Sequence, residues 1–283
     1  MTRPFNVEDF AGMLDDAAVF PPGNAAVPDA VRAHLARRAQ PESELVGSLV
    51  VSPGHLAEVT AAMPDGERIA VSVVIRDLSL LPEVVRAVSA ESRLQLSAVE
   101  LAVAGASGVA AAITAVERHL PPGVDVWIEP GWGEDTLAAM DRTAAAGHRL
   151  KLRTGGTEAS AFPPVPALAT AVVEAVSRGL AFKATAGLHS ALRHRDPVTG
   201  FEHHGFANLL LAAARATDGL AAVLGVLGQS RGDVVAQGLL DLGRDELHAV
   251  RTQRFVSFGT CDVAEPHQDL ISLGLLATPA GVA

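Results

Sequence analysis

The sequence contains no tyrosine, and aromatic residues make up only 4% of its 283 residues. Proteins that bind single-stranded nucleic acid stack the bases on aromatic side chains, so a base-stacking surface is not expected here. The net charge of -10 would also repel a phosphate backbone, and no run of lysine and arginine offsets it locally. We therefore expect no nucleic-acid partner.

The sequence also has little cysteine, and we find no signal sequence and no long apolar run in it. The single cysteine, Cys261, cannot form an intrachain disulfide, and the first ten residues, MTRPFNVEDF, contain no apolar signal core. No uncharged apolar run reaches the ~18 residues that a membrane helix needs. We expect a cytoplasmic protein with no membrane partner, in which Cys261 has a small apolar packing role.

Short β-like segments alternate with longer alanine-rich helical segments, which is typical of a parallel sheet with helical crossovers. This pattern predicts an α/β protein in which residues 1–283 form one domain, a single (β/α)₈ TIM barrel with a long loop after strand seven. The alternative is an open doubly wound sheet, but no GxGxxG motif follows the first strand, and we expect no cofactor. The eight predicted strands are Leu14 to Phe20, Leu45 to Val51, Ile69 to Ile75, Ser97 to Val103, Val124 to Glu129, Arg149 to Arg153, Leu180 to Ala186 and Arg254 to Gly259.

Four consecutive predicted strands carry an ionisable residue inside an otherwise apolar run. They are Glu100, Glu129, Lys151 and Lys183, in strands four to seven. Active sites of barrels lie at the C-terminal ends of the strands, and neighbouring strands are ~4.8 Å apart. The two lysines are therefore expected to lie close together inside the barrel.

Two neighbouring lysines suit imine chemistry. A lysine attacks a carbonyl only as the free amine, and burial beside a second cation favours that form. Lys183 and Arg153 could each be the cation beside Lys151, while Glu100 and Glu129 could transfer protons. The alternative is a lumen of Glu-Lys pairs with no chemistry.

The order of these residues resembles deoxyribose-phosphate aldolase, a family of class I aldolases on (β/α)₈ barrels. The segments are SAVELAV with Glu100, VDVWIEP with Glu129, RLKLRTGG with Lys151 and AFKATAGLH with Lys183. By this resemblance, Lys151 forms the Schiff base, Lys183 perturbs it, and the acidic residue on strand four is a glutamate where the family has an aspartate. The resemblance implies a lyase acting on a small aldehyde, keto or sugar substrate, phosphorylated or not.

The chain also differs from that family. Arg153 replaces a small polar residue, Ala186 replaces a glycine, and His189 replaces an arginine. The ends of strands seven and eight, where the family binds phosphate, are only partly similar. Of the acidic pair in strand one we take Asp16 to point inward, because side chains alternate along a strand. We expect substrate contacts from Asp16, Arg153, Thr154, Gly155, Gly187, His189, Gly259 and Thr260.

The segment Gly187 to Gly205, after strand seven, is unusually rich in histidine and arginine. It could form a mobile lid over an anionic substrate, a rim or subunit contact, or a metal site together with Asp15, Asp16 or His267. Its spacing matches no known ligand motif, so we assign no metal site. The competing functions are a metal-dependent hydrolase or isomerase that uses residues 189–204, and a barrel without catalysis. The protein could also form a homo-oligomer.

Overall fold

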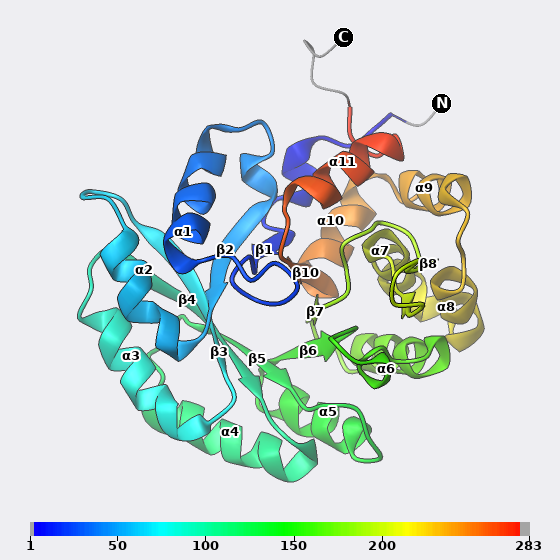
Figure 1. Ribbon diagram of the computed structural model, residues 1–283. Helices are drawn as coiled ribbons and strands as arrows, with labels where there is room; N and C mark the ends of the chain where they lie inside the picture. Colours follow the sequence, from blue (N-terminus) through cyan, green and yellow to red (C-terminus); the bar gives the residue numbers. More distant parts are fainter. Residues whose placement is uncertain (1–2, 278–283) are drawn as a thin grey trace.

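The computed structural model describes residues 3–277. Eight parallel strands close into a barrel in the order β1-β10-β7-β6-β5-β4-β3-β2, and helices surround it (Figure 1). The predicted single (β/α)₈ TIM barrel is confirmed. Near the two ends of the chain, Phe5 forms an isolated parallel bridge with Leu276.

Each of the eight predicted strands overlaps a strand of the barrel, although the first ends at Asp16 instead of Phe20 and the fourth begins at Leu94 instead of Ser97. In β3, six of the seven residues of the run IAVSVVI are buried, because a parallel strand is covered on both faces and therefore reads as a nearly continuous apolar run. The barrel strands are β1 Leu14–Asp16, β2 Val46–Val51, β3 Ile69–Ile75, β4 Leu94–Ala102, β5 Asp125–Glu129, β6 Arg149–Arg153, β7 Phe182–Thr185 and β10 Phe255–Thr260.

The α-helices follow the strands and turn their apolar residues toward the barrel. In α6, for example, Leu168, Val172 and Ala175 recur at helical spacing and are fully buried. The helices are α1 Val27–Ala36, α2 Leu56–Ala62, α3 Leu81–Ser89, α4 Gly105–His119, α5 Thr136–Ala145, α6 Val165–Ser177, α7 Phe206–Ala214, α8 Leu220–Leu227, α9 Gly232–Leu240, α10 Gly243–Gln253 and α11 Ala264–Ser272. Short 3₁₀ helices are η1 Val7–Phe10, η2 Arg37–Ala39, η3 Ser43–Leu45, η4 Pro53–His55, η5 Leu78–Leu80, η6 Ala159–Ala161 and η7 Arg215–Asp218.

The connection from β7 to β10 is the most elaborate in the barrel. It starts with the predicted loop, which contains a two-stranded antiparallel hairpin of β8 His194–Arg195 and β9 Glu202–His203. Helices α7 to α10 follow, so four helices stand where a simple crossover has one. This additional layer lies over the side of the barrel formed by β7 and β10.

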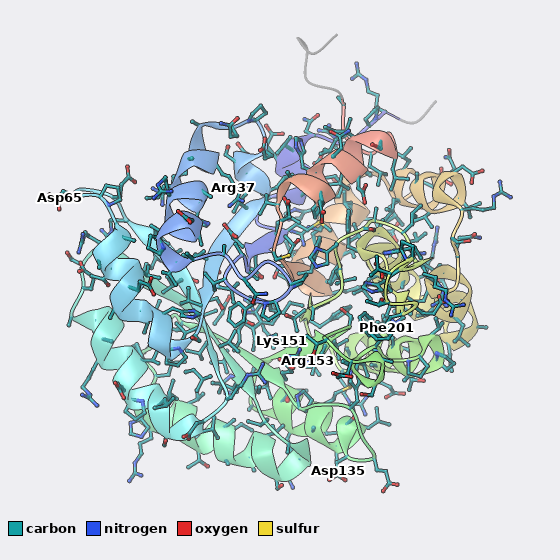
Figure 2. The ribbon with its side chains drawn as sticks, in the orientation of Figure 1. Arg37, Asp65, Asp135, Lys151, Arg153 and Phe201 are labelled. Carbon is teal, nitrogen blue, oxygen red and sulfur yellow. The ribbon has the colours of Figure 1, made fainter. Side chains whose placement is uncertain are left out.

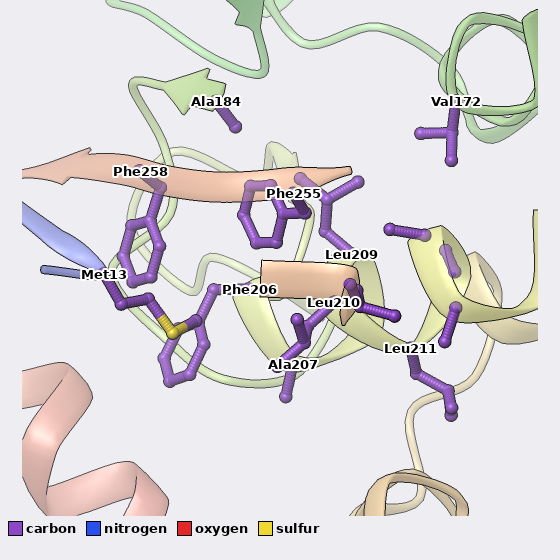
Figure 3. Close-up of a cluster of buried hydrophobic side chains, with 14 of the residues drawn as sticks. Met13, Val172, Ala184, Phe206, Ala207, Leu209, Leu210, Leu211, Phe255 and Phe258 are labelled. Carbon is purple, nitrogen blue, oxygen red and sulfur yellow. The ribbon is translucent and has the colours of Figure 1, made fainter. Parts of the chain in front are cut away.

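A cluster of large apolar side chains holds that layer in place (Figure 3). The rings of Phe206 from α7 and Phe258 from β10 stack with centroids 5.0 Å apart, and Phe255 packs against Phe182. All four rings are fully buried. Burying each phenylalanine contributes roughly 1.5–3 kcal/mol, so this cluster fixes the position of β7 and β10.

One helical stretch, residues 159–177, is long and apolar enough to cross a membrane by length and composition alone. It comprises η6 and α6 of the barrel, and core helices of globular proteins often meet the same criterion. Five residues of α6 are buried against the rest of the protein.

Candidate active site

Six charged side chains meet inside the barrel. Lys151 and Arg153 lie near its centre in Figure 2. Five of the six are no more than 6% exposed, and Arg153 is partly buried. They come from five strands and are Asp15 of β1, Glu100 of β4, Glu129 of β5, Lys151 and Arg153 of β6, and Lys183 of β7.

Glu100 joins the two lysines. Its Oε2 lies 2.7 Å from Lys151 Nζ, and its Oε1 accepts a hydrogen bond of 2.7 Å from Lys183 Nζ. Ser72 Oγ on β3 also donates to Oε1, at 2.7 Å. One buried carboxylate therefore holds both amines, as expected from their positions on neighbouring strands.

Glu129 joins Lys151 to Arg153. Its Oε1 accepts a hydrogen bond of 2.7 Å from Arg153 Nε, and its Oε2 lies 3.0 Å from Lys151 Nζ. This Oε2 is buried, and the Lys151 ammonium is its ion-pair partner. A carboxylate oxygen at this distance from an amine is in position to exchange a proton with it.

Lys183 is also held from the opposite side, by Asp15. Asp15 Oδ2 lies 2.7 Å from Lys183 Nζ and accepts a hydrogen bond of 2.7 Å from Ser257 Oγ of β10. The prediction that Asp16 is the inward member of the pair is wrong. Asp16 instead pairs with Arg37 Nη1 at 2.6 Å and His34 Nδ1 at 3.0 Å, and these residues belong to η2 and α1.

Strand register explains this convergence. Lys151 and Lys183 are direct partners in the β6–β7 pairing, and Glu100 is the partner of Trp127 in the β4–β5 pairing. Side chains alternate across a strand, so Glu129 points the same way as Trp127, and Arg153 the same way as Lys151. The Trp127 ring lies 5.3 Å from Lys183 Nζ and supports this ammonium by a cation–π contact.

The ion pairs determine the charge states of two groups. Burial by itself would raise the pKa of Glu100, but the ammonium groups of Lys151 and Lys183 hold that pKa far below its usual range. Burial would likewise lower the pKa of Lys183, but Asp15 and Glu100 raise it above its usual range. Lys183 is thus held as a cation and Glu100 as an anion.

Glu129 is ionised for a similar reason. Burial opposes ionisation, while Lys151 and Arg153 lower the pKa of the carboxyl group below its ordinary value. The network therefore contains three carboxylates facing three basic side chains.

Thr154, Gly155 and Gly187 build the rim where β6 and β7 end. Thr154 Oγ1 donates to the carbonyl oxygen of Ala186 at 2.6 Å. A Cβ on Gly155 would lie 3.0 Å from Gly187 Cα and 2.8 Å from the Phe162 ring, so packing between the two strand ends requires glycine. These residues shape the mouth above the lysines.

Gly259, Thr260 and His189 lie at the ends of β7 and β10. Gly259 pairs with Asp15 and with Thr185, whereas Thr260 Oγ1 donates to the carbonyl oxygen of Asp262 at 2.7 Å. His189 Nδ1 is 3.3 Å from Glu265 Oε2.

Cys261 is half-buried beside that histidine, with its Sγ 3.7 and 3.8 Å from the two ring nitrogens of His189. Burial raises the pKa of the thiol, which favours the unreactive protonated form.

The histidine-rich hairpin packs over the loop that follows β6. Phe162 of that loop contacts Phe201 and His203, with centroids 5.5 and 4.5 Å apart. His203 Nδ1 lies 3.3 Å from the carbonyl oxygen of Gly187, and the buried His204 contacts the carbonyl oxygen of Pro163 through Nε2 at 2.7 Å. The hairpin thus lies beside the mouth of the barrel, while its mobility stays a prediction.

No group of three or more histidine, cysteine, aspartate or glutamate side chains among residues 3–277 is arranged to hold a metal ion. The hairpin histidines therefore offer no support for the metal-dependent alternative.

The scarcity of lysine in the sequence also marks this site. Of the 22 lysines and arginines, only Lys151 and Lys183 are lysines, and the other basic residues are all arginine. Lysine is normally a surface residue, yet both lysines are 2% exposed and share one carboxylate. A chain that uses arginine everywhere else has its only two side-chain amines at one site.

Comparison with known proteins does not assign the chain to a family. No protein-family model matches it, and no curated protein matches its sequence.

Proposed function

We propose that the chain is a Schiff-base-forming carbon–carbon lyase of the class I aldolase type, with Lys151 as the nucleophile. The observation that carries this proposal is the placement of the two lysines inside the barrel, on either side of Glu100. A purely structural ion-pair network does not need amines, because arginine satisfies carboxylates with more hydrogen bonds and stays charged. Amines that can lose a proton and form a covalent bond are what imine chemistry requires.

The surroundings distinguish the roles of the two lysines. Lys183 lies between Asp15 and Glu100, which raise its pKa, so it stays protonated and cannot attack a carbonyl. Lys151 is paired with Oε2 of Glu129 at 3.0 Å, and this oxygen can accept its proton. Lys151 is therefore the nucleophile, and Lys183 is the fixed positive charge beside it.

The proposed reaction begins when the Lys151 ammonium loses a proton to Glu129 and its nitrogen attacks the carbonyl carbon of the substrate. The C–N bond forms as the carbonyl π electrons move to oxygen. Glu129 returns that proton to the alkoxide oxygen to give the carbinolamine. It then moves a second proton from the nitrogen to this hydroxyl group, which leaves as water as the nitrogen lone pair forms the C=N bond of the iminium ion. This ion accepts the electron pair released when the neighbouring carbon–carbon bond breaks, while a carboxylate takes the proton of the hydroxyl that becomes the new carbonyl.

Reductive trapping tests the proposal. The protein is incubated with small aldehydes and ketones, reduced with borohydride, and analysed by intact mass and peptide mapping. We expect one adduct on Lys151, its loss in Lys151→Ala, and its retention in Lys183→Ala. The assignment is simple because the chain has no other lysine, which leaves the terminal amine as the only background site.

Two other results would change the conclusion. An adduct on Lys183 that survives in Lys151→Ala would reverse the two roles. If neither lysine forms an adduct with any compound while both variants remain folded, the lyase proposal is wrong.

A further inference from the structure

The free edge of Arg153 lies directly beside the amine that attacks the substrate. Arg153 Nε and Lys151 Nζ contact the two oxygens of the same Glu129 carboxyl group, at 2.7 and 3.0 Å. The two residues are separated by one position on β6 and point to the same face, about 6.6 Å apart along the strand. A group bound by this guanidinium must therefore be close to the carbon that Lys151 attacks.

The guanidinium has capacity for a further ligand. Only its Nε is engaged, by Glu129, and within residues 3–277 its two Nη atoms make no hydrogen bond or ion pair. The Arg153 side chain is 29% exposed, whereas Lys151 behind it is 2% exposed. A substrate entering from the mouth thus meets two free N–H edges before it meets the amine.

The fold holds this arginine in a fixed position. Trp132, in the segment between β5 and α5, donates a hydrogen bond of 2.8 Å from its Nε1 to the Arg153 carbonyl oxygen. Glu129 fixes the guanidinium plane from the other side through Nε. The planar fork of a guanidinium matches the two oxygens of a carboxylate, and such charge-assisted pairs are strong and directional.

The neighbouring rim, where β7 and β10 end, is less suited to an anion. A Cβ on Gly23 would lie 2.8 Å from Cys261 Cβ and from the Ala18 carbonyl oxygen, so the loop after β1 is packed directly against the end of β10. The acidic residues Asp262 and Glu265 follow in the next turns. A phosphate group placed there would meet negative charge.

We infer that the substrate is a short oxo acid, whose carboxylate lies next to the reacting carbonyl and is bound by the Nη atoms of Arg153. This inference rests on the proposed Schiff-base function and specifies its substrate class. A carboxylate on the carbon beside the carbonyl, or one carbon further away, satisfies both contacts, because amine and guanidinium share one carboxyl group. A phosphate at the far end of a sugar chain does not.

The experiment compares trapping of three probes by the intact protein: pyruvate as a 2-oxo acid, acetone as an uncharged ketone, and glyceraldehyde 3-phosphate as a phosphorylated aldehyde. The half-saturating concentration for borohydride trapping on Lys151 is measured for each. In Arg153→Gln we expect the value for pyruvate to rise about 10- to 100-fold, as for loss of a charge-assisted hydrogen bond, while that for acetone changes less than about threefold. The ratio of the two values corrects for any effect of the variant on the amine itself.

A matched control is Arg149→Gln. Arg149 lies on the same strand, two residues before Lys151, but pairs with Asp125 at the opposite end of the lumen. This variant should leave the pyruvate-to-acetone ratio unchanged.

The outcomes separate the substrate class from the reaction. If Lys151 is trapped by acetone or by the phosphorylated aldehyde but not preferentially by pyruvate, or if Arg153→Gln affects all probes equally, the oxo-acid inference is overturned and the lyase proposal stands. If no probe is trapped on Lys151, both are overturned.

Discussion

Replacing Glu100 by glutamine removes the charge that lies between the two lysines. The variant keeps the size of the side chain and the hydrogen bond from Ser72, but leaves a positive charge uncompensated in a site that is 2% exposed. Breaking a buried ion pair by removing one partner costs about 3–5 kcal/mol of unfolding free energy. Because Lys151 keeps Glu129 and Lys183 keeps Asp15, we expect the lower end, about 3 kcal/mol at pH 7.

The pH dependence gives this prediction a sign. The folded-state pKa of Glu100 is far below its ordinary value of 4.5, so its stabilising contribution is complete above 4.5 and declines as the pH falls. Between the folded-state pKa of Glu100 and 4.5, the unfolded wild type binds a proton that the folded wild type does not. The difference between wild type and variant should therefore shrink by about 1.4 kcal/mol between pH 7 and pH 3.5.

Urea unfolding followed by circular dichroism at both pH values measures this difference. Glu58→Gln, which changes an exposed glutamate of α2, is the matched control and should cost less than about 0.5 kcal/mol. A difference below about 1 kcal/mol for the Glu100 variant at pH 7, or one that stays constant down to pH 3.5, would refute the role of Glu100 as the shared counter-ion.

Two further predictions concern the rim of the barrel. Burial lowers the pKa of His203, so the stabilisation that the neutral imidazole gives to hairpin docking is complete above the ordinary pKa of 6.5 and is lost as the pH falls. Hydrogen-exchange protection of residues 194–203 should therefore drop from pH 7 to pH 5. An equal drop in the His203→Gln variant would contradict this prediction. Ala186 has a φ of 64° and Gly187 a φ of 74°. In urea unfolding, Ala186→Gly should therefore be more stable than the wild type by up to about 1 kcal/mol. Gly187→Ala should be less stable by at least about 2 kcal/mol, because the new Cβ would also crowd Phe162. The reverse order of stability would show that left-handed backbone strain does not limit this turn.

The sequence was sufficient for the barrel and for every member of its charged centre except Asp15. All eight strands appear where apolar runs bounded by turn residues predicted them, because parallel strands buried on both faces cannot tolerate scattered polar residues. The same rule made Glu100, Glu129, Lys151 and Lys183 conspicuous. Their order along the chain placed them on adjacent strands of a barrel, and this is where the structure has them.

The sequence was less informative wherever the outcome depended on contacts between distant segments. In the β7–β10 connection, the run FANLLLAAA of α7 is apolar apart from Asn208, and all nine residues are buried, which is typical of a covered helix. The sequence does not indicate which strand this helix packs against; the packing of Phe206 on Phe258 decides that. The hairpin inside the predicted loop depends on the pairing of His194 with His203, which only the docking of the segment against Phe162 makes favourable.

The acidic pair of β1 shows the limit most clearly. Alternation determines that Asp15 and Asp16 point to opposite sides, but β1 has three residues and all are buried, so its apolar pattern cannot set which one faces the lumen. Tertiary structure decides which of the two side chains faces the lumen. Lys183 and Ser257 are the partners of Asp15 inside the barrel. Arg37 and His34 are the partners of Asp16 outside it. A buried carboxylate is tolerated only where such partners exist, and those partners come from parts of the chain up to 242 residues away.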